Sequence, residues 1–215
     1  MKAELIDHMG DDRTVVNAAR VSFDKESKEF SEKDAKLIQF LAKHKHVVPF
    51  AHPQLSFRCN APIFVARQLA KHQVGFVWNE VSRRYVDYEP TFYEPTQWRT
   101  RAINKKQGSG EPVEKKENEL LILAYRVLSK QISMAYNELV KVGIAPEQAR
   151  MLLPLNTYTS WIWTGSLLGF IRVCQLRLQQ DAQEETRMLV TQIASEVKRL
   201  FPASWLAFFP EEKNA

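Results

Sequence analysis

Apolar residues recur at helical spacing in several separate stretches of this chain. The clearest set is Leu37, Ile38 and Leu41, which share one face of a predicted helix that ends near His44. Ser31-Glu32-Lys33-Asp34 precedes this face with the spacing of a capping box, which gives the helix a defined start. Further helices are predicted at Thr14 to Val21, in a short segment from Pro146 that carries Arg150, at about 166–177 and at about 182–200.

The longest periodic stretch runs from Val113 to Val142. Its apolar residues alternate at spacings of three and four, which predicts one long helix with an apolar stripe. A stripe of this kind usually lies in the core of its own domain, and burial in a subunit interface is the less common use. We therefore expect the stripe to be core. Its members are Leu121, Tyr125, Leu128, Ile132, Tyr136 and Leu139.

Strand patterns are short and separated by helices. Residues 2–8 predict a short strand, and Gln54 to Asn60 alternates between apolar and polar residues. Ala61 to Ala66 follows with Pro62 at a first helical position and predicts a short helix. Asn156 to Thr164 is β-prone and aromatic, residues 86–98 predict short extended pieces, and Lys105 to Pro112 is the clearest flexible stretch.

We interpret these elements as a single α+β domain over residues 1–215, in which several helices, one of them long, pack a small sheet. A chain of 215 residues is long enough to bury a sizeable core. The flexible stretch lies within the domain, because neither side of it carries motifs that could fold alone.

Composition limits the class of protein. No apolar run approaches the roughly 20 residues that span a bilayer, and the first residues lack the apolar segment of a signal peptide. We therefore expect a cytoplasmic protein with no membrane partner. The two cysteines, Cys59 and Cys174, give no disulfide framework.

The net charge of +5 favours anionic partners, either nucleic acid or small polyanions such as nucleotides and folates. Nucleic-acid modules usually gather Lys and Arg in a patch with exposed aromatic residues. Here acids and bases alternate, as in Glu111 to Glu119. Small anions are the favoured partners, and we expect no nucleic-acid partner.

Polar side chains concentrate in one segment, Gln68 to Tyr85, where the apolar periodicity lapses after His72. A carboxylate, a hydroxyl and two guanidinium groups there suit a phosphorylated, hydrogen-bonding ligand. On spacing alone, an ordinary solvated loop with a chance pair of arginines is an equal alternative. The polar residues are Asn79, Glu80, Ser82, Arg83 and Arg84.

This segment resembles the signature of the flavin-dependent thymidylate synthases, which is Arg-His-Arg, seven or eight residues, and then Ser-x-Arg-Tyr. Here it is Lys71-His72-Gln73, eight residues, and then Ser82-Arg83-Arg84-Tyr85. The resemblance runs from Ala18 to about residue 200. Its other matching stretches are Ala18 to Asp24, Ala61 to Gln68, Ala149-Arg150, Leu153 to Asn156 and Leu176-Arg177.

The resemblance implies the flavin-dependent thymidylate synthase fold and the methylation of dUMP to dTMP. FAD would deliver a hydride, methylenetetrahydrofolate the carbon and NADPH the reducing equivalents, without an enzymic nucleophile. The better-known thymidylate synthases instead add a cysteine thiolate to C6 of uracil. Cys59 is expected in mid-strand and Cys174 at an apolar-facing helical position, so neither offers a thiol for that chemistry. Two further hypotheses are a relative that hydroxymethylates or otherwise modifies a pyrimidine nucleotide, and a non-catalytic nucleotide- or RNA-binding protein that has lost flavin.

The resemblance also assigns roles to individual residues. Arg177 matches the catalytic arginine that contacts the uracil ring and favours its ionised form. Substrate-binding positions are Gln68, Lys71, Glu80, Ser82, Arg83, Arg84, Arg150 and Arg177. Cofactor-binding positions are His46, Val48, Lys71, His72, Gln73, Asn79, Glu80, Ser166 and Arg172.

A homotetramer with active sites shared between subunits is also implied by the resemblance. One subunit would contribute Gln68, Lys71 and Arg177, and its partner Glu80 to Arg84 and Arg150. We expect no metal, because His44 and His46 lack the spacing of a helical ligand pair and no cysteine pair joins them.

The chain departs from the family pattern mainly at flavin positions. Lys71 loses the bidentate fork of arginine and Gln73 loses its charge. Leu168, Ser166 and Val48 replace an arginine, an asparagine and a small hydroxyl residue that are common in the family. Arg172 is expected to restore one positive charge. Flavin affinity is therefore the property that these departures are expected to affect, whereas Arg84, Arg150 and Arg177 are retained.

Overall fold

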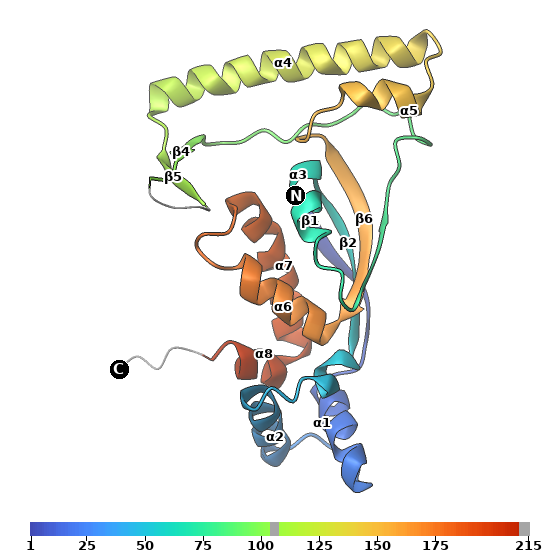
Figure 1. Ribbon diagram of the computed structural model, residues 1–215, viewed down its shortest axis with the longest axis vertical. Coiled ribbons are helices and arrows are strands. Elements are labelled where there is room, and N and C mark those ends of the chain that lie inside the picture. The colour runs from blue at the N-terminus through green and yellow to red at the C-terminus, as the bar shows by residue number, and fades with distance from the viewer. Residues whose placement is uncertain (104–107, 211–215) are drawn as a thin grey trace.

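The computed structural model describes residues 1–103 and 108–210 (Figure 1). Its centre is an antiparallel four-stranded sheet in the order β1-β2-β6-β3, and a separate hairpin pairs β4 with β5. The strands are β1 (Lys2–Met9), β2 (Gln54–Pro62), β3 (Phe76–Glu80), β4 (Arg99–Arg101), β5 (Ser109–Pro112) and β6 (Tyr158–Ser166). The α+β class with a small sheet is confirmed.

The helices cover one face and both ends of this sheet (Figure 1). The α-helices are α1 (Asp12–Arg20), α2 (Glu32–Lys43), α3 (Ile63–Leu69), α4 (Lys115–Lys141), α5 (Pro146–Ala149), α6 (Leu167–Arg177), α7 (Glu184–Leu200) and α8 (Pro202–Phe208). Short 3₁₀ turns occupy Val21–Phe23, Val48–Ala51 and Arg150–Leu152. None of the helices in these ranges is long and apolar enough to cross a membrane.

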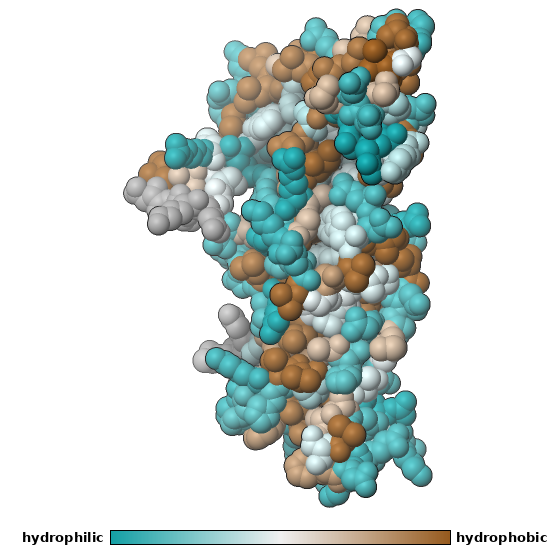
Figure 2. Space-filling view, turned by 45° about the vertical axis from the view of Figure 1, so that its right-hand side comes forward, coloured by the Kyte–Doolittle hydropathy of each residue, from teal (hydrophilic) through white to brown (hydrophobic). Residues whose placement is uncertain are grey.

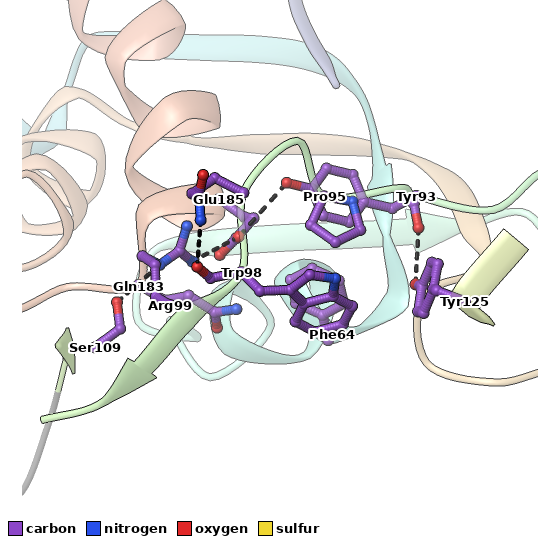
Figure 3. Close-up of a pocket in the computed structure, with 10 residues that line it drawn as sticks. Phe64, Tyr93, Pro95, Trp98, Arg99, Ser109, Tyr125, Gln183 and Glu185 are labelled. Carbon is purple, nitrogen blue, oxygen red and sulfur yellow. Dashed lines mark hydrogen bonds and ion pairs between the residues drawn. The ribbon is translucent and has the colours of Figure 1, made fainter. Parts of the chain in front are cut away.

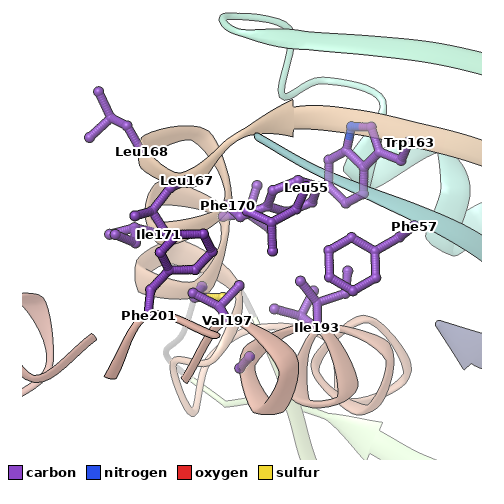
Figure 4. Close-up of a cluster of buried hydrophobic side chains, with 14 of the residues drawn as sticks. Leu55, Phe57, Trp163, Leu167, Leu168, Phe170, Ile171, Ile193, Val197 and Phe201 are labelled. Atoms are coloured by element: carbon purple, nitrogen blue, oxygen red, sulfur yellow. The ribbon is translucent and has the colours of Figure 1, made fainter. Parts of the chain in front are cut away.

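The core lies between the sheet and the α6–α7 pair (Figure 4). Alternation on β2 turns Leu55 and Phe57 toward Phe170 of α6 and Ile193 of α7, and all four side chains are fully buried. The opposite sheet face has no helix over it in Figure 1, and Val77 of β3 is 71% exposed there.

Aromatic pairing joins β3 to this core. The rings of Phe76 and Trp163 stack with centroids 4.8 Å apart, and Trp78 stacks on Trp161 at 4.5 Å. A side chain at Gly165 would lie 2.2 Å from the Phe76 ring, so this approach of β3 to β6 requires glycine.

Carboxylates define several helix starts, and two of them, Asp12 and Asp34, are buried. Ser31 and Asp34 form the predicted capping box of α2, and Asp11 caps α1. Asp12 accepts hydrogen bonds from the backbone N–H groups of Ala203 (2.7 Å) and Ser204 (2.9 Å), and thereby caps α8. α8 was not predicted, because its cap lies far away in the sequence.

The long helix α4 has nearly the predicted bounds, but the prediction that its stripe is core is wrong for the single chain. Leu121 is 41% and Leu128 57% exposed, and only Tyr136 of the stripe is fully buried. In Figure 1 α4 lies across one end of the molecule, away from the sheet. Figure 2 shows apolar residues gathered at that end. Helical periodicity identified an apolar face without indicating what covers it.

Two stretches that we expected to be irregular contain strands. Asn79 and Glu80, expected in a loop, are the last residues of β3, which pairs with β6. Ser109–Pro112, expected to be flexible, forms β5 opposite Arg99–Arg101, while residues 105–107 of that stretch lie outside the described residues. Both strands have five residues or fewer, too few for alternation to identify them. An isolated bridge between Phe92 and Thr157 agrees with the extended pieces predicted at 86–98.

Candidate active site

A cleft of about 460 Å³ opens between the end of α3, the end of α6 and the loop that leads into α7. It brings together three predicted substrate-binding residues, Gln68, Lys71 and Arg177. α3 follows β2 directly and α6 follows β6 directly, and β2 and β6 pair along their whole length, so the sheet fixes where both helices start. The lining residues are Gln68, Lys71, Arg99, Gly108, Ser109, Arg177, Asp181, Ala182 and Gln183.

Two contacts orient the guanidinium group of Arg177. Its Nε donates to Nε2 of His72 at 3.1 Å, and one terminal nitrogen donates to the carbonyl oxygen of Gln68 at 3.4 Å. His72 is therefore a neutral imidazole with its proton on Nδ1. Burial, and then the charge of Arg177, lower the pKa of His72. A guanidinium has five N–H donors, so these contacts leave donors for a ligand.

The side chain of Gln68 is also fixed. Its amide nitrogen donates to the side-chain oxygen of Gln183, and its oxygen accepts a hydrogen bond from the Thr186 hydroxyl at 3.2 Å. Lys71 is exposed and supplies a second positive charge at the cleft. Gln73 lies exposed in the turn that follows.

Asn79 and Glu80 lie elsewhere, at the outer strand β3. They line a shallow pocket of about 260 Å³ with Arg58, Ser160 and Ile162. The Glu80 carboxylate accepts hydrogen bonds from the Thr159 hydroxyl at 2.7 Å and from Trp78 Nε1 at 3.2 Å. The carboxylate is thus held at a fixed position beside the loop that begins at Val81.

The two arginines of the loop after β3, Arg83 and Arg84, lie in different environments. The guanidinium of Arg83 donates to the Tyr88 carbonyl oxygen at 2.7 Å and lies 4.6 Å from the Tyr88 ring centre and 5.6 Å from that of Tyr136 on α4. Arg84 is exposed and contacts Ser82 Oγ at 3.3 Å through its Nε. Arg83 therefore fixes the loop against α4, and Arg84 is the arginine that the loop presents to solvent.

Arg150 begins the 3₁₀ turn after α5 rather than lying on an α-helix. It is exposed, and its Nε donates to the Glu147 carbonyl oxygen at 3.3 Å. Within residues 1–103 and 108–210, the side-chain hydrogen bonds of Arg150, Arg84 and Glu80 go to Glu147, Ser82, Thr159 and Trp78, none of which lines the cleft of Arg177. A single chain thus holds the predicted substrate residues in separate groups.

His46 and Val48 line a third hollow, an apolar pocket of about 690 Å³ between α1, α2 and the Val48–Ala51 turn. Phe23 and Phe40 contribute aromatic walls and Lys25 adds a positive charge, while Arg20 is paired with the Asp34 carboxylate. The pocket suits a large planar ring beside anionic groups. It therefore fits part of a flavin, although the sequence pattern alone did not reveal it.

Two other predicted cofactor positions lie on α6. Ser166 is buried and caps the helix, because its hydroxyl accepts a hydrogen bond from the Gly169 N–H at 3.1 Å. Arg172 is exposed on the helix surface. Their cofactor contacts stay predictions. Neither thiol is suited to nucleophilic chemistry, since burial raises the pKa of Cys59 and of Cys174 to about 12.

Arg99, Asp181 and Gln183 are cleft residues that sequence reasoning missed. Arg99 lies on a three-residue strand and Gln183 just before α7, and neither belongs to a recognisable motif. Only the tertiary structure brings them beside Gln68. Within the described ranges, no three His, Cys, Asp or Glu side chains are grouped as metal ligands.

The α+β fold and this cleft define a class of protein whose site suits a small, anionic, hydrogen-bonding molecule and whose two cysteines are buried. The family model described as "Thymidylate synthase complementing protein" matches residues 4–203. The chain therefore belongs to the flavin-dependent thymidylate synthase family and is an enzyme. Membership disfavours the non-catalytic alternative.

Individual relatives agree with this assignment. A flavin-dependent thymidylate synthase of Thermus thermophilus is 42% identical over 95% of this chain and 74% of its own length. That of Thermosipho africanus is 36% identical over 95% of this chain and 89% of its own. Among solved structures, the UMP/dUMP methylase PolB from Streptomyces cacaoi bound with 5-Br UMP has a TM-score of 0.87 and 26% identity, covering 97% of this chain and 93% of PolB.

Proposed function

We propose that this enzyme methylates dUMP to dTMP, with methylenetetrahydrofolate as the carbon donor and NADPH as the reductant of bound FAD. The observation that carries the proposal is the Arg177 guanidinium, held by His72 and the Gln68 carbonyl in a cationic cleft. Family membership supports the nucleotide and the flavin.

The chemistry requires C5 of uracil, a poor nucleophile, to attack a one-carbon unit. A fixed, permanently charged guanidinium at the ring stabilises its ionised form and so raises electron density at C5. Lys71 and Arg177 supply positive charge where an anionic nucleotide binds. Bound flavin, when reduced, supplies a hydride, and the protein's own tasks are binding, orientation and electrostatics.

The flavin part of the proposal is supported by the pocket of His46 and Val48. Its apolar walls suit the ring system, and Lys25 at its edge suits the diphosphate, whereas Arg20 is already paired with the buried Asp34 carboxylate. His72, Gln73, Asn79 and Arg172 complete the proposed contacts. The loss of charge at Gln73 predicts weaker flavin binding than an arginine would give there.

We further propose a homotetramer in which each active site combines residues of two subunits. Gln68, Lys71 and Arg177 would meet Glu80, Ser82, Arg84 and Arg150 of a partner. The separation of these groups within one chain supports this arrangement. The exposed apolar surface of α4 supports assembly as well, since Leu121 and Leu128 of the stripe are 41% and 57% exposed, and Leu120, Leu123 and Met134 outside the stripe are each 58–63% exposed. Two buried free cysteines agree with a reducing, cytoplasmic compartment.

A second candidate substrate is UMP, because the structural neighbour PolB is named a UMP/dUMP methylase and was solved with 5-Br UMP. Both nucleotides present the same uracil and phosphate groups. They differ only at the ribose 2′ position.

Incubation of the FAD-loaded protein with methylenetetrahydrofolate, NADPH and either nucleotide tests the proposal. We expect dTMP from dUMP, and less or no methylated product from UMP. Failure to convert either nucleotide would overturn the proposed activity, and a preference for UMP would select the second candidate.

A further inference from the structure

Arg99 joins the β4–β5 hairpin to the first turn of α7 at the wall of the cleft (Figure 3). Its three guanidinium nitrogens all have protein partners. Nε donates to Ser109 Oγ at 2.8 Å, one terminal nitrogen to Glu184 at 2.7 Å and the other to Glu185 at 2.7 Å. Arg99 lines the cleft, but the two glutamates neutralise its charge and protein oxygens accept hydrogen bonds from all three of its guanidinium nitrogens. Lys71 differs, because it is exposed. This arrangement suits a positioning role rather than an anion-binding one.

The two carboxylate partners differ sharply in burial. The Glu184 side chain is 46% exposed, whereas that of Glu185 is 6% exposed. Burial raises the pKa of Glu185, but the hydrogen bond and charge of Arg99 outweigh it, so the pKa lies below its usual value. Because an exposed ion pair is screened by solvent and a buried one is not, Glu185 is the partner that fixes Arg99.

The first turn of α7 also fixes Gln68, one of the proposed nucleotide-binding residues of the cleft. Gln183 and Thr186, which flank the two glutamates, hold the side chain of Gln68. The backbone carbonyl of Gln68 in turn accepts a hydrogen bond from Arg177. A continuous series of contacts therefore runs from Arg99 through the first turn of α7 to Arg177.

We propose that Arg99 and Glu185 are positioning residues for the nucleotide: their buried ion pair fixes the first turn of α7, and thereby the placement of Gln68 and Arg177. The inference rests on the proposed function, because it names the support of the same nucleotide site. A binding group that is displaced by a fraction of an ångström loses much of its contribution to affinity.

The test compares Glu185→Gln with Glu184→Gln in the FAD-loaded protein, with dUMP binding measured by titration calorimetry. The two variants make the same chemical change at adjacent positions facing the same arginine, so the second is a matched control. We expect Glu185→Gln to raise the dissociation constant of dUMP at least about tenfold and Glu184→Gln to change it less than about twofold. FAD affinity should stay within about threefold in both variants, whereas kcat at saturating dUMP should fall in Glu185→Gln and not in Glu184→Gln, because the displaced Arg177 also acts on the uracil ring during the reaction.

Equal dUMP affinities in the two variants would overturn the inference. So would a lower unfolding temperature of Glu185→Gln with unchanged dUMP affinity, since that is the result for a residue that only stabilises the fold. If Glu185→Gln does not fold, Arg99→Lys replaces it, and an unchanged dissociation constant there would be equally decisive. Absence of dUMP binding by the wild-type protein would instead refute the proposed function, and the inference with it.

Discussion

The contact between Arg177 and His72 predicts how activity depends on pH. A neutral His72 accepts the Arg177 hydrogen bond through Nε2, and a protonated one cannot. The pKa of His72 is lowered from its ordinary value of 6.5, so the neutral form, and with it the bond, persists above that lowered pKa. As the pH falls through the pKa of His72, the imidazole becomes protonated and the hydrogen bond from Arg177 is lost. The imidazolium of His72 and the guanidinium of Arg177 are then two neighbouring cations. We therefore expect the kcat/KM for dUMP to fall on the acid side.

The size of the effect follows from the bond. A hydrogen bond to a charged donor contributes about 1.5–3 kcal/mol, and the partial exposure of His72 reduces this to roughly 1–2 kcal/mol. His72→Ala should therefore lower kcat/KM for dUMP by a factor of roughly 5–30 at neutral pH. His72→Gln is the matched control, because the amide oxygen can accept in place of Nε2 and does not titrate.

The assay is steady-state dTMP formation from pH 5 to 9 with FAD and both co-substrates saturating. We expect the wild-type acid limb to be absent in His72→Gln, while His72→Ala is slow at every pH. FAD affinity is measured in parallel, since His72 is also a proposed flavin contact. An acid limb that survives unchanged in His72→Gln would refute the reasoning.

Three further predictions concern the cofactor, the loop and the assembly. The purified protein should show flavin absorbance or take up added FAD, and no uptake at high micromolar FAD would contradict the flavin pocket of His46 and Val48. Ser82→Ala should weaken dUMP binding in a calorimetric titration without abolishing turnover. Arg84→Ala and Arg177→Ala should each be nearly inactive, since each removes a charged hydrogen bond of about 2–5 kcal/mol from every site. Refolded together, they should regain activity, because random pairing leaves about a quarter of sites with both arginines. No regain on mixing would place both arginines in one subunit's site.

Local sequence signals predicted the elements whose causes are local. The start of α2 could be predicted from Ser31 and Asp34, because the capping box that they form spans only four residues. The start of α8 could not, because its cap is Asp12 at the other end of the chain. β3 was missed for a similar reason. It is held by the stacking of Phe76 and Trp78 on tryptophans of β6, and the five residues of β3 alone cannot predict that contact.

Some residues of the candidate site could likewise be predicted from the sequence, and others only from the tertiary structure. The resemblance identified Gln68, Lys71, His72 and Arg177, and the structure places them together. It did not identify Arg99, whose role depends on carboxylates from a helix more than eighty residues away. The exposed stripe of α4 is the reverse case, because periodicity revealed an apolar face but held no information about its partner.

The central claim is flavin-based methylation of dUMP without an enzymic thiol. Its most direct test is dTMP formation by the folded Cys59→Ala/Cys174→Ala protein, with and without FAD. Removing two buried thiols should lower stability by about 1–3 kcal/mol and leave turnover largely intact. We predict dTMP in the presence of FAD and none in its absence. Complete loss of turnover in the folded, FAD-loaded double variant, beside an active wild-type protein, would contradict the account and indicate thiolate addition.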